Sequence, residues 1–152
     1  MHPFPHRYTV TTSATAVGDI ELTAPGVDVL RTTTPAEFDG PGDRWSPETL
    51  LTGAVVDCFA LTFRGIARNS KLPWLSLHCD IAGTLDRVER VTQFIEFDLQ
   101  VRLVVPDGAD RVQAQRVLEK AEQNCLVANS LKAPVRLTID VETAAAVALG
   151  GV

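Results

Sequence analysis

The sequence lacks the features that mark three common classes of protein. It has no run of basic residues and a formal net charge of −5, which argues against non-specific binding to nucleic acid. Residues 1–10 contain no basic region followed by an apolar one, so no secretory signal is expected. The most apolar stretch carries Asp57 and Arg64, which argues against a membrane span of roughly 20 residues. We therefore expect a cytoplasmic protein that binds neither nucleic acid nor membrane.

Cysteine and histidine are also few. Three cysteines in 152 residues, an odd number, fit a reducing compartment better than a framework of disulfides. The three histidines, His2, His6 and His78, show no spacing typical of metal ligands. Since the sequence offers no site for a metal, a flavin or a nucleotide, no cofactor is expected.

What is present is typical of one globular domain over residues 1–152, with 45% hydrophobic and 22% charged residues. Alternation, helical periodicity and turn residues predict strands at 7–15, 20–24 and 27–34, a helix at 46–70, strands at 75–88 and 91–105, a helix at 109–125 and a strand at 135–144. This order predicts an α+β fold, a largely antiparallel sheet with two long helices on it.

The helix expected at residues 46–70 is the element around which the chain is organised. Ser46 is suited to cap its first turn, Pro47 to the first helical position, and Glu48 to the positive end of the helix dipole. Apolar residues occupy most of its circumference, as in a central helix that is covered on several sides. Because one small sheet and one other helix cannot cover so much apolar surface, we expect a second copy of the chain to bury the rest.

Two of the three cysteines are candidates for chemistry. Cys79 fits a small core residue in a strand, beside Leu77 and Ile81. Cys58 and Cys125 each lie on the apolar side of a predicted helix, so the two could face each other where the helices pack. Their separation excludes a local zinc motif. On spacing alone, core packing remains the better interpretation of both.

A reactive thiol at Cys58 would need a nearby cation, because burial in a helix interior disfavours the thiolate. Arg44 and Arg31 are the candidates in the preceding part of the chain, or the cation could come from a second subunit. Glu48 lies about 15 Å from Cys58 along a straight helix that rises roughly 1.5 Å per residue. Taken alone, Glu48 is therefore best interpreted as an acid that supports the helix start.

Two stretches resemble a known family. Residues 46–59, SPETLLTGAVVDCF, are similar to the helix of the OsmC/Ohr family that starts with Asn/Ser-Pro-Glu and carries Cys-Phe ten residues after the glutamate. Residues 121–131, AEQNCLVANSL, resemble the end of its second helix, A-x-x-x-C-P-V-S-N-S-L. The family comprises osmotically inducible protein C and the organic hydroperoxide resistance proteins. The order and length of the elements match over nearly the whole chain.

The resemblance implies an intertwined homodimer with two active sites at the subunit interface, and a thiol peroxidase activity. By analogy Cys58 is the nucleophile that becomes a sulfenic acid, Cys125 resolves it as a disulfide, and Glu48 holds a catalytic arginine. An organic hydroperoxide is the implied substrate and an external dithiol the reductant, without a cofactor.

The chain departs from the family pattern at two points. Position 126 is Leu where the family usually has Pro, and no Arg stands at the family's usual offsets upstream of the helix. Arg44 is the arginine nearest to the motif, and Arg31 is the next candidate. Two alternatives from other classes stay open: a dimeric module that binds a small apolar ligand, and a redox sensor without peroxidase turnover.

Overall fold

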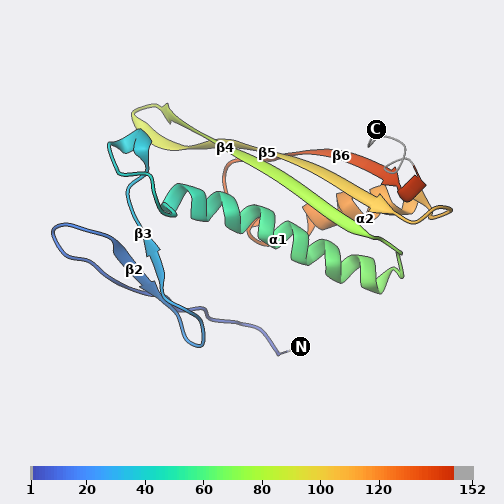
Figure 1. Ribbon diagram of the computed structural model, residues 1–152, viewed down its shortest axis with the longest axis horizontal. Helices are drawn as coiled ribbons and strands as arrows, with labels where there is room; N and C mark the ends of the chain where they lie inside the picture. Colours follow the sequence, from blue (N-terminus) through green and yellow to red (C-terminus); the bar gives the residue numbers. More distant parts are fainter. Residues whose placement is uncertain (1, 146–152) are drawn as a thin grey trace. The chain divides into compact units, whose positions relative to one another are not determined.

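The computed structural model describes residues 2–145, which fall into two compact units, residues up to 51 and residues from 52 onward (Figure 1). The first unit contains the strands β1 (Thr11–Ser13), β2 (Ile20–Thr23) and β3 (Leu30–Thr32), the 3-10 turn η1 (Ala36–Phe38) and the start of helix α1 (Pro47–Asn69). The second contains the rest of α1, the strands β4 (Ser76–Val88) and β5 (Val91–Val105), helix α2 (Arg111–Gln123), the 3-10 turn η2 (Ala128–Ser130) and strand β6 (Val135–Thr143). The predicted α+β class and the predicted order of elements are confirmed.

The first unit holds shorter strands than the sequence predicted. Its sheet is antiparallel in the order β1-β2-β3, but β1 covers three residues of the expected 7–15, and β3 three of the expected 27–34. All of β1 is exposed. The Thr- and Val-rich composition of these segments indicates only strand propensity. Without a buried face, this propensity does not stabilise a longer strand.

The second unit is built on a mixed sheet in the order β4-β5-β6. Strands β4 and β5 form the predicted antiparallel hairpin, closed by Glu89 and Arg90 at positive φ angles of 49° and 71°, as in a two-residue type I′ turn. Strand β6 pairs with β5 in parallel, because α2 carries the chain back across the sheet between them. The largely antiparallel pairing is as expected, but the strands form two sheets, and the sheet of the second unit is mixed.

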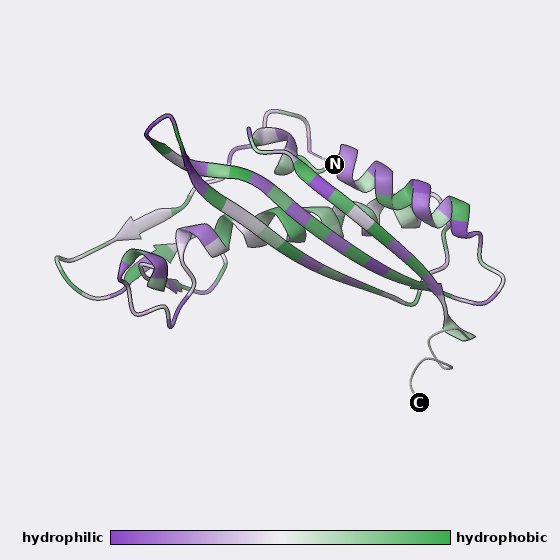
Figure 2. Cartoon of the chain, turned by 90° about the horizontal axis from the view of Figure 1, so that it is seen from above, coloured by the Kyte–Doolittle hydropathy of each residue, from purple (hydrophilic) through white to green (hydrophobic). Residues whose placement is uncertain are grey.

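The core of the second unit lies between its sheet and the two helices. Every second residue of β5 from Phe97 to Val105 is buried, and Figure 2 shows the matching alternation of hydrophobic and hydrophilic residues along the strands. Helix α2 begins at the N-cap Asp110, whose carboxylate accepts two backbone N–H bonds. Its buried residues are Ala114, Val117, Leu118 and Ala121, whereas Val112 is exposed.

Helix α1 starts as predicted. Ser46 Oγ accepts the backbone N–H of Thr49 at 3.2 Å, and Ser46 N–H donates to Thr49 Oγ1 at 2.8 Å, so the two residues cap the first turn reciprocally. Pro47 is the first helical residue. The reciprocal cap fixes where the helix begins, and therefore where Glu48 lies on it.

Within the single chain α1 buries one stripe of side chains, not its whole circumference. The buried residues are Val55, Phe59, Phe63 and Ala67, one helical turn apart. Leu61, on another side, is 54% exposed. By length and composition alone α1 is apolar enough to cross a membrane, a test that the core helix of a globular protein also passes. The single chain thus leaves apolar surface on α1 uncovered.

Candidate functional site: a thiol pair between two helices

The structure brings Cys58 and Cys125 together. Cys58 lies in the middle of α1, and Cys125 lies two residues beyond the end of α2, where it is only 2% exposed. Both are free thiols, and the Cys58 side chain lies close enough to Cys125 to raise the pKa of that thiol. The expected contact between the two thiols is therefore present, although Cys125 belongs to the turn that follows α2 and not to the helix itself.

The Cys125 sulfur is enclosed by backbone groups. It donates to the carbonyl oxygen of Val55 at 3.8 Å, which ties it to α1 one turn before Cys58. Burial raises the pKa of the Cys125 thiol to about 11, and contact with Cys58 raises it too, against the lowering effect of hydrogen bonds from the backbone of Ala128 and Val127. At neutral pH Cys125 is consequently a neutral thiol that carries its proton. This suits a group that acts after the first attack on a substrate better than one that makes it.

The raised pKa of Cys125 leads to a prediction about its alkylation. In the double variant Cys58→Ser/Cys79→Ser, the remaining thiol should react with iodoacetamide at a rate that keeps rising well above pH 9, the ordinary value for a thiol. At pH 8 a pKa near 11 leaves a thiolate fraction of about one in a thousand. The measurement is the alkylation rate against pH, with the urea-unfolded protein as control. A midpoint near pH 9 in the folded protein would contradict the assignment.

The raised pKa of Cys125 also affects the stability of the fold at alkaline pH. The folded-state pKa of Cys125 lies above the unfolded value of 9.0. The protonated thiol therefore contributes its full share of the free energy of unfolding below pH 9, and this contribution is lost between about pH 9 and 11.

Cys79 fits its interpretation as a core residue. It lies on β4 opposite Val101, half-buried, and packs against the core of the second unit. Burial raises the pKa of this thiol to about 11, with a smaller contribution from the charge of Asp80. A protonated thiol packed among apolar side chains serves as a small hydrophobic residue.

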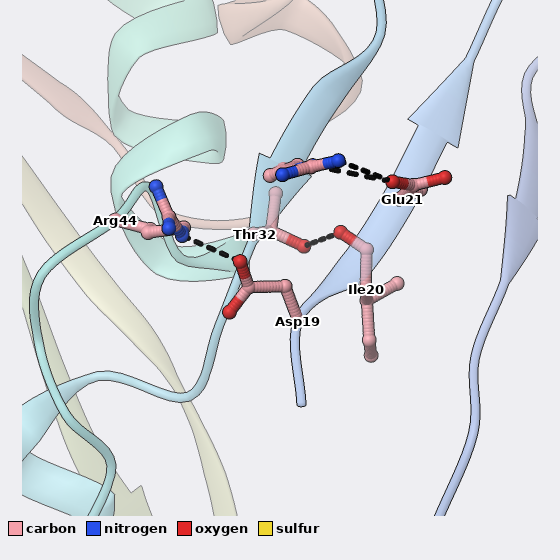
Figure 3. Close-up of polar contacts among 6 residues, drawn as sticks. Asp19, Ile20, Glu21, Thr32 and Arg44 are labelled. Carbon is pink, nitrogen blue, oxygen red and sulfur yellow. Dashed lines mark hydrogen bonds and ion pairs between the residues drawn. The ribbon is translucent and has the colours of Figure 1, made fainter. Parts of the chain in front are cut away.

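The two candidate arginines both pair with acids of the first unit (Figure 3). Arg44 donates from Nε to Asp19 Oδ2 at 2.6 Å, and Arg31 donates to Glu21 Oε1 at 3.1–3.2 Å. Asp19 could not be predicted as a partner of Arg44 from the sequence, because a Gly-Asp pair before a strand is explained by turn chemistry alone. No local signal links Asp19 to a residue 25 positions away. The structure therefore assigns Arg44 an orienting carboxylate that the sequence did not.

Glu48 lies in the first turn of α1, half-buried, beside a cavity of about 340 Å³ in the first unit. The cavity is lined by Ile20, Thr32, Thr33, Thr34, Pro35, Phe38, Pro47 and Glu48. Arg44 and Glu48 thus belong to the first unit, and Cys58 and Cys125 to the second. The pairing of Glu48 with an arginine that serves Cys58 stays a prediction.

Among residues 2–145 no group of three or more His, Cys, Asp or Glu side chains is arranged to hold a metal ion. The chemistry that this part of the chain supports directly is that of two adjacent thiols, which can pass between a dithiol and a disulfide.

An α+β domain with a reduced thiol pair between its two long helices defines the class of protein to which this chain belongs. Residues 40–140 match the model of the OsmC-like protein family. The chain is therefore a member of the OsmC-like family, as its two motifs indicated. Members of this family are generally dimers.

Individual relatives agree with this assignment. The chain is 27% identical over 139 residues to an organic hydroperoxide resistance protein of Xanthomonas axonopodis pv. citri, covering 89% of this chain and 96% of that protein. It is 27% identical over 120 residues to the uncharacterized protein YmaD of Bacillus subtilis, covering 77% of each. Its fold is similar to that of an OsmC-like protein of unknown function from Vibrio cholerae, with a TM-score of 0.82 at 16% identity, over 90% of this chain and 100% of that one.

Proposed function

We propose that the protein is a thiol-dependent peroxidase that reduces organic hydroperoxides to alcohols. The observation that carries the proposal is the contact between the free thiols of Cys58 and Cys125, in a chain of the OsmC-like family. A relative of nearly equal length is named for resistance to organic hydroperoxides, which supports the choice of substrate class.

In the proposed mechanism the two cysteines act in turn. The Cys58 thiolate attacks the outer oxygen of the hydroperoxide, the O–O bond breaks, and the alkoxide leaves as the alcohol after taking a proton. Cys58 becomes a sulfenic acid. The Cys125 sulfur then attacks it, water leaves, and the resulting disulfide is reduced by an external dithiol through thiol–disulfide exchange. Cys125 is the natural second thiol because it is protonated at neutral pH and touches Cys58.

Arg44 and Glu48 complete the proposed site. Arg44 would supply positive charge for the Cys58 thiolate and for the oxygen that leaves, from the same chain or from the partner subunit. Glu48 would hold and orient that arginine, and Asp19 already fixes one edge of the Arg44 guanidinium. The odd number of cysteines fits a reducing compartment, so we place the activity in the cytoplasm.

Turnover with a dithiol tests the proposal directly. The purified protein with dihydrolipoamide should consume tert-butyl and cumene hydroperoxide catalytically, faster than it consumes hydrogen peroxide. Peroxide loss is followed in a ferrous–xylenol orange assay, with Cys58→Ser as the blank. The absence of turnover with every hydroperoxide and dithiol offered would reject the enzyme and leave binding or sensing.

We also propose that the protein works as a homodimer. Only 22% of the most apolar window of α1 is buried within the protomer, and Leu61 on that helix is half exposed. A second copy that covers α1 would remove this apolar surface from water. Sedimentation velocity at micromolar concentration should give a single dimeric species. A monomer under these conditions would refute the assembly.

A redox sensor without turnover is the second candidate. It is favoured by the ion pair between Arg44 and Asp19, because an arginine engaged by a carboxylate is less available to a substrate oxygen. In this case one equivalent of hydroperoxide would oxidise the thiol pair, and added dithiol would restore it without sustained consumption.

A further inference from the structure

The turn that follows α2 is closed by hydrogen bonds around Cys125. The backbone N–H of Cys125 donates to Glu122 O at 3.1 Å, and the carbonyl oxygen of Cys125 accepts the N–H of Asn129 at 2.9 Å. The cysteine is therefore fixed on both its N- and C-terminal sides. Because its sulfur is tied to α1 as well, a small change in the turn alters where the sulfur lies relative to Cys58.

Asn129 bonds across this turn twice. In addition to its backbone bond to Cys125, its side-chain Nδ2 donates to Gln123 O, the last residue of α2, at 3.0 Å. The side chain thus connects the far end of the turn to the end of the helix. Removing this donor would remove one of the hydrogen bonds that hold the segment from Gln123 to Asn129, which contains Cys125.

Packing does not replace this link. Leu126, directly after Cys125, is 69% exposed, so burial does not fix its side chain or the backbone beside it. Ser130 Oγ donates to Leu126 O at 2.7 Å, a second side-chain bond to the same turn. The part of the turn that follows Cys125 is therefore held by polar side chains, in addition to the burial of Cys125 itself.

We propose that Asn129 is a positioning residue for the second thiol, whose side-chain amide holds the turn so that the Cys125 sulfur stays within reach of Cys58 and closes the disulfide rapidly. The proposal rests on the proposed function for the step it concerns. In that step a bond forms between the two sulfurs, the S–O bond of the Cys58 sulfenic acid breaks, and hydroxide leaves as water with the proton of Cys125. Asn129 does not touch the reacting atoms.

Single-turnover oxidation of two variants tests this role. Asn129→Ala removes the amide, and Asn129→Asp keeps its shape but cannot donate to Gln123 O. Reduced protein is mixed with cumene hydroperoxide and quenched with dimedone, and intact mass spectrometry counts the reduced, sulfenic and disulfide forms over time. Sulfenic acid should form within about twofold of the wild-type rate. Disulfide closure should slow by about tenfold, since misplacement of reacting groups by about 1 Å costs up to roughly a hundredfold.

Asn124→Ala is the matched control. Asn124 lies before the turn and, like Asn129, donates from Nδ2 to a main-chain carbonyl, Lys120 O at 2.8 Å, but its bond stays on the helix and does not cross the turn. It should close the disulfide at the wild-type rate. Three results would overturn the proposal: normal closure in both Asn129 variants, equal slowing of both chemical steps, or the same slowing in Asn124→Ala.

Failure of the proposed function is distinguishable from failure of the positioning role. If the wild-type protein forms no sulfenic acid, the peroxidase proposal is rejected, and equilibration with oxidised and reduced dithiothreitol measures the thiol pair without a peroxide. In this equilibrium, the effective concentration of the Cys125 thiol at Cys58 should be about tenfold lower in the Asn129 variants than in the wild type or in Asn124→Ala. Equal effective concentrations in all four proteins would reject the positioning role independently.

Discussion

Replacing Cys58 with serine should abolish dithiol-dependent hydroperoxide consumption, with a loss of more than about a thousandfold. A serine hydroxyl at this position is not ionised at neutral pH and cannot become a sulfenic acid. Removal of a covalent nucleophile is among the largest single effects in enzymes, because all of the chemistry passes through it. The measurement is kcat/KM with cumene hydroperoxide and dihydrolipoamide.

Two further serine variants separate the roles of the remaining thiols. Cys125→Ser should still consume about one equivalent of hydroperoxide, because Cys58 can still react, but should lose most turnover. Cys79→Ser is the matched control and should keep wild-type kinetics, since Cys79 is a packed residue of β4. An active Cys58→Ser variant, or a Cys79→Ser variant as inactive as Cys58→Ser, would contradict the assignment.

Replacing Arg44 with alanine should lower kcat/KM by about a hundredfold, as removal of one charge-stabilising donor does in other enzymes. It should also slow alkylation of Cys58 at neutral pH, because the thiolate loses its compensating charge. Glu48→Ala should act in the same direction by releasing the arginine from its orienting carboxylate. If both act through one ion pair, the double variant should lose little more than the worse single variant.

Arg31→Ala is the control for the arginine. Arg31 carries the same charge in the same unit and is paired with Glu21 at 3.1 Å, so its loss should leave turnover unchanged. If Arg44→Ala and Glu48→Ala leave turnover unchanged and Arg31→Ala is inactive, Arg31 is the arginine that activates Cys58. If all three variants keep wild-type turnover and alkylation rates, no arginine activates the thiols and the two cysteines are core residues without a catalytic role. Glu48→Ala would then cost only a few tenths of a kcal/mol, as a helix-start acid does.

The sequence predicted the order of elements because its signals were local. Alternation along residues 91–105 and the capping residues Ser46 and Pro47 each specify structure within a few positions. The parallel pairing of β6 could not be predicted, because alternation in residues 135–144 is the same in either direction. The extra length expected for β1 and β3 followed from strand propensity in segments with almost no buried face.

The candidate site divides in the same way. The contact between Cys58 and Cys125 could be predicted because α1 and α2 pack into one core, although Cys125 lies in the turn after α2 and not on the helix face. The pairing of Arg44 with Asp19 could not be predicted, because it joins two loops whose residues are already accounted for as turn residues. The bonds of Asn129 were also missed, because a segment that leads out of a helix carries no periodic signal that indicates which side chain crosses back.

The parallel register of β5 and β6 has a consequence for the order of folding. Residues Val88 and Val91 meet across a two-residue turn, so the β4–β5 hairpin can form early and without the rest of the chain. Phe97 pairs with Val135, and this contact forms only after the whole of α2 has crossed the sheet. Cys125 lies on that crossover, so it reaches Cys58 late. A newly made chain therefore passes through a period in which Cys58 and Cys125 are not yet in contact and both thiols can react with other molecules. Pulsed alkylation during refolding should find Cys79 protected before Cys125.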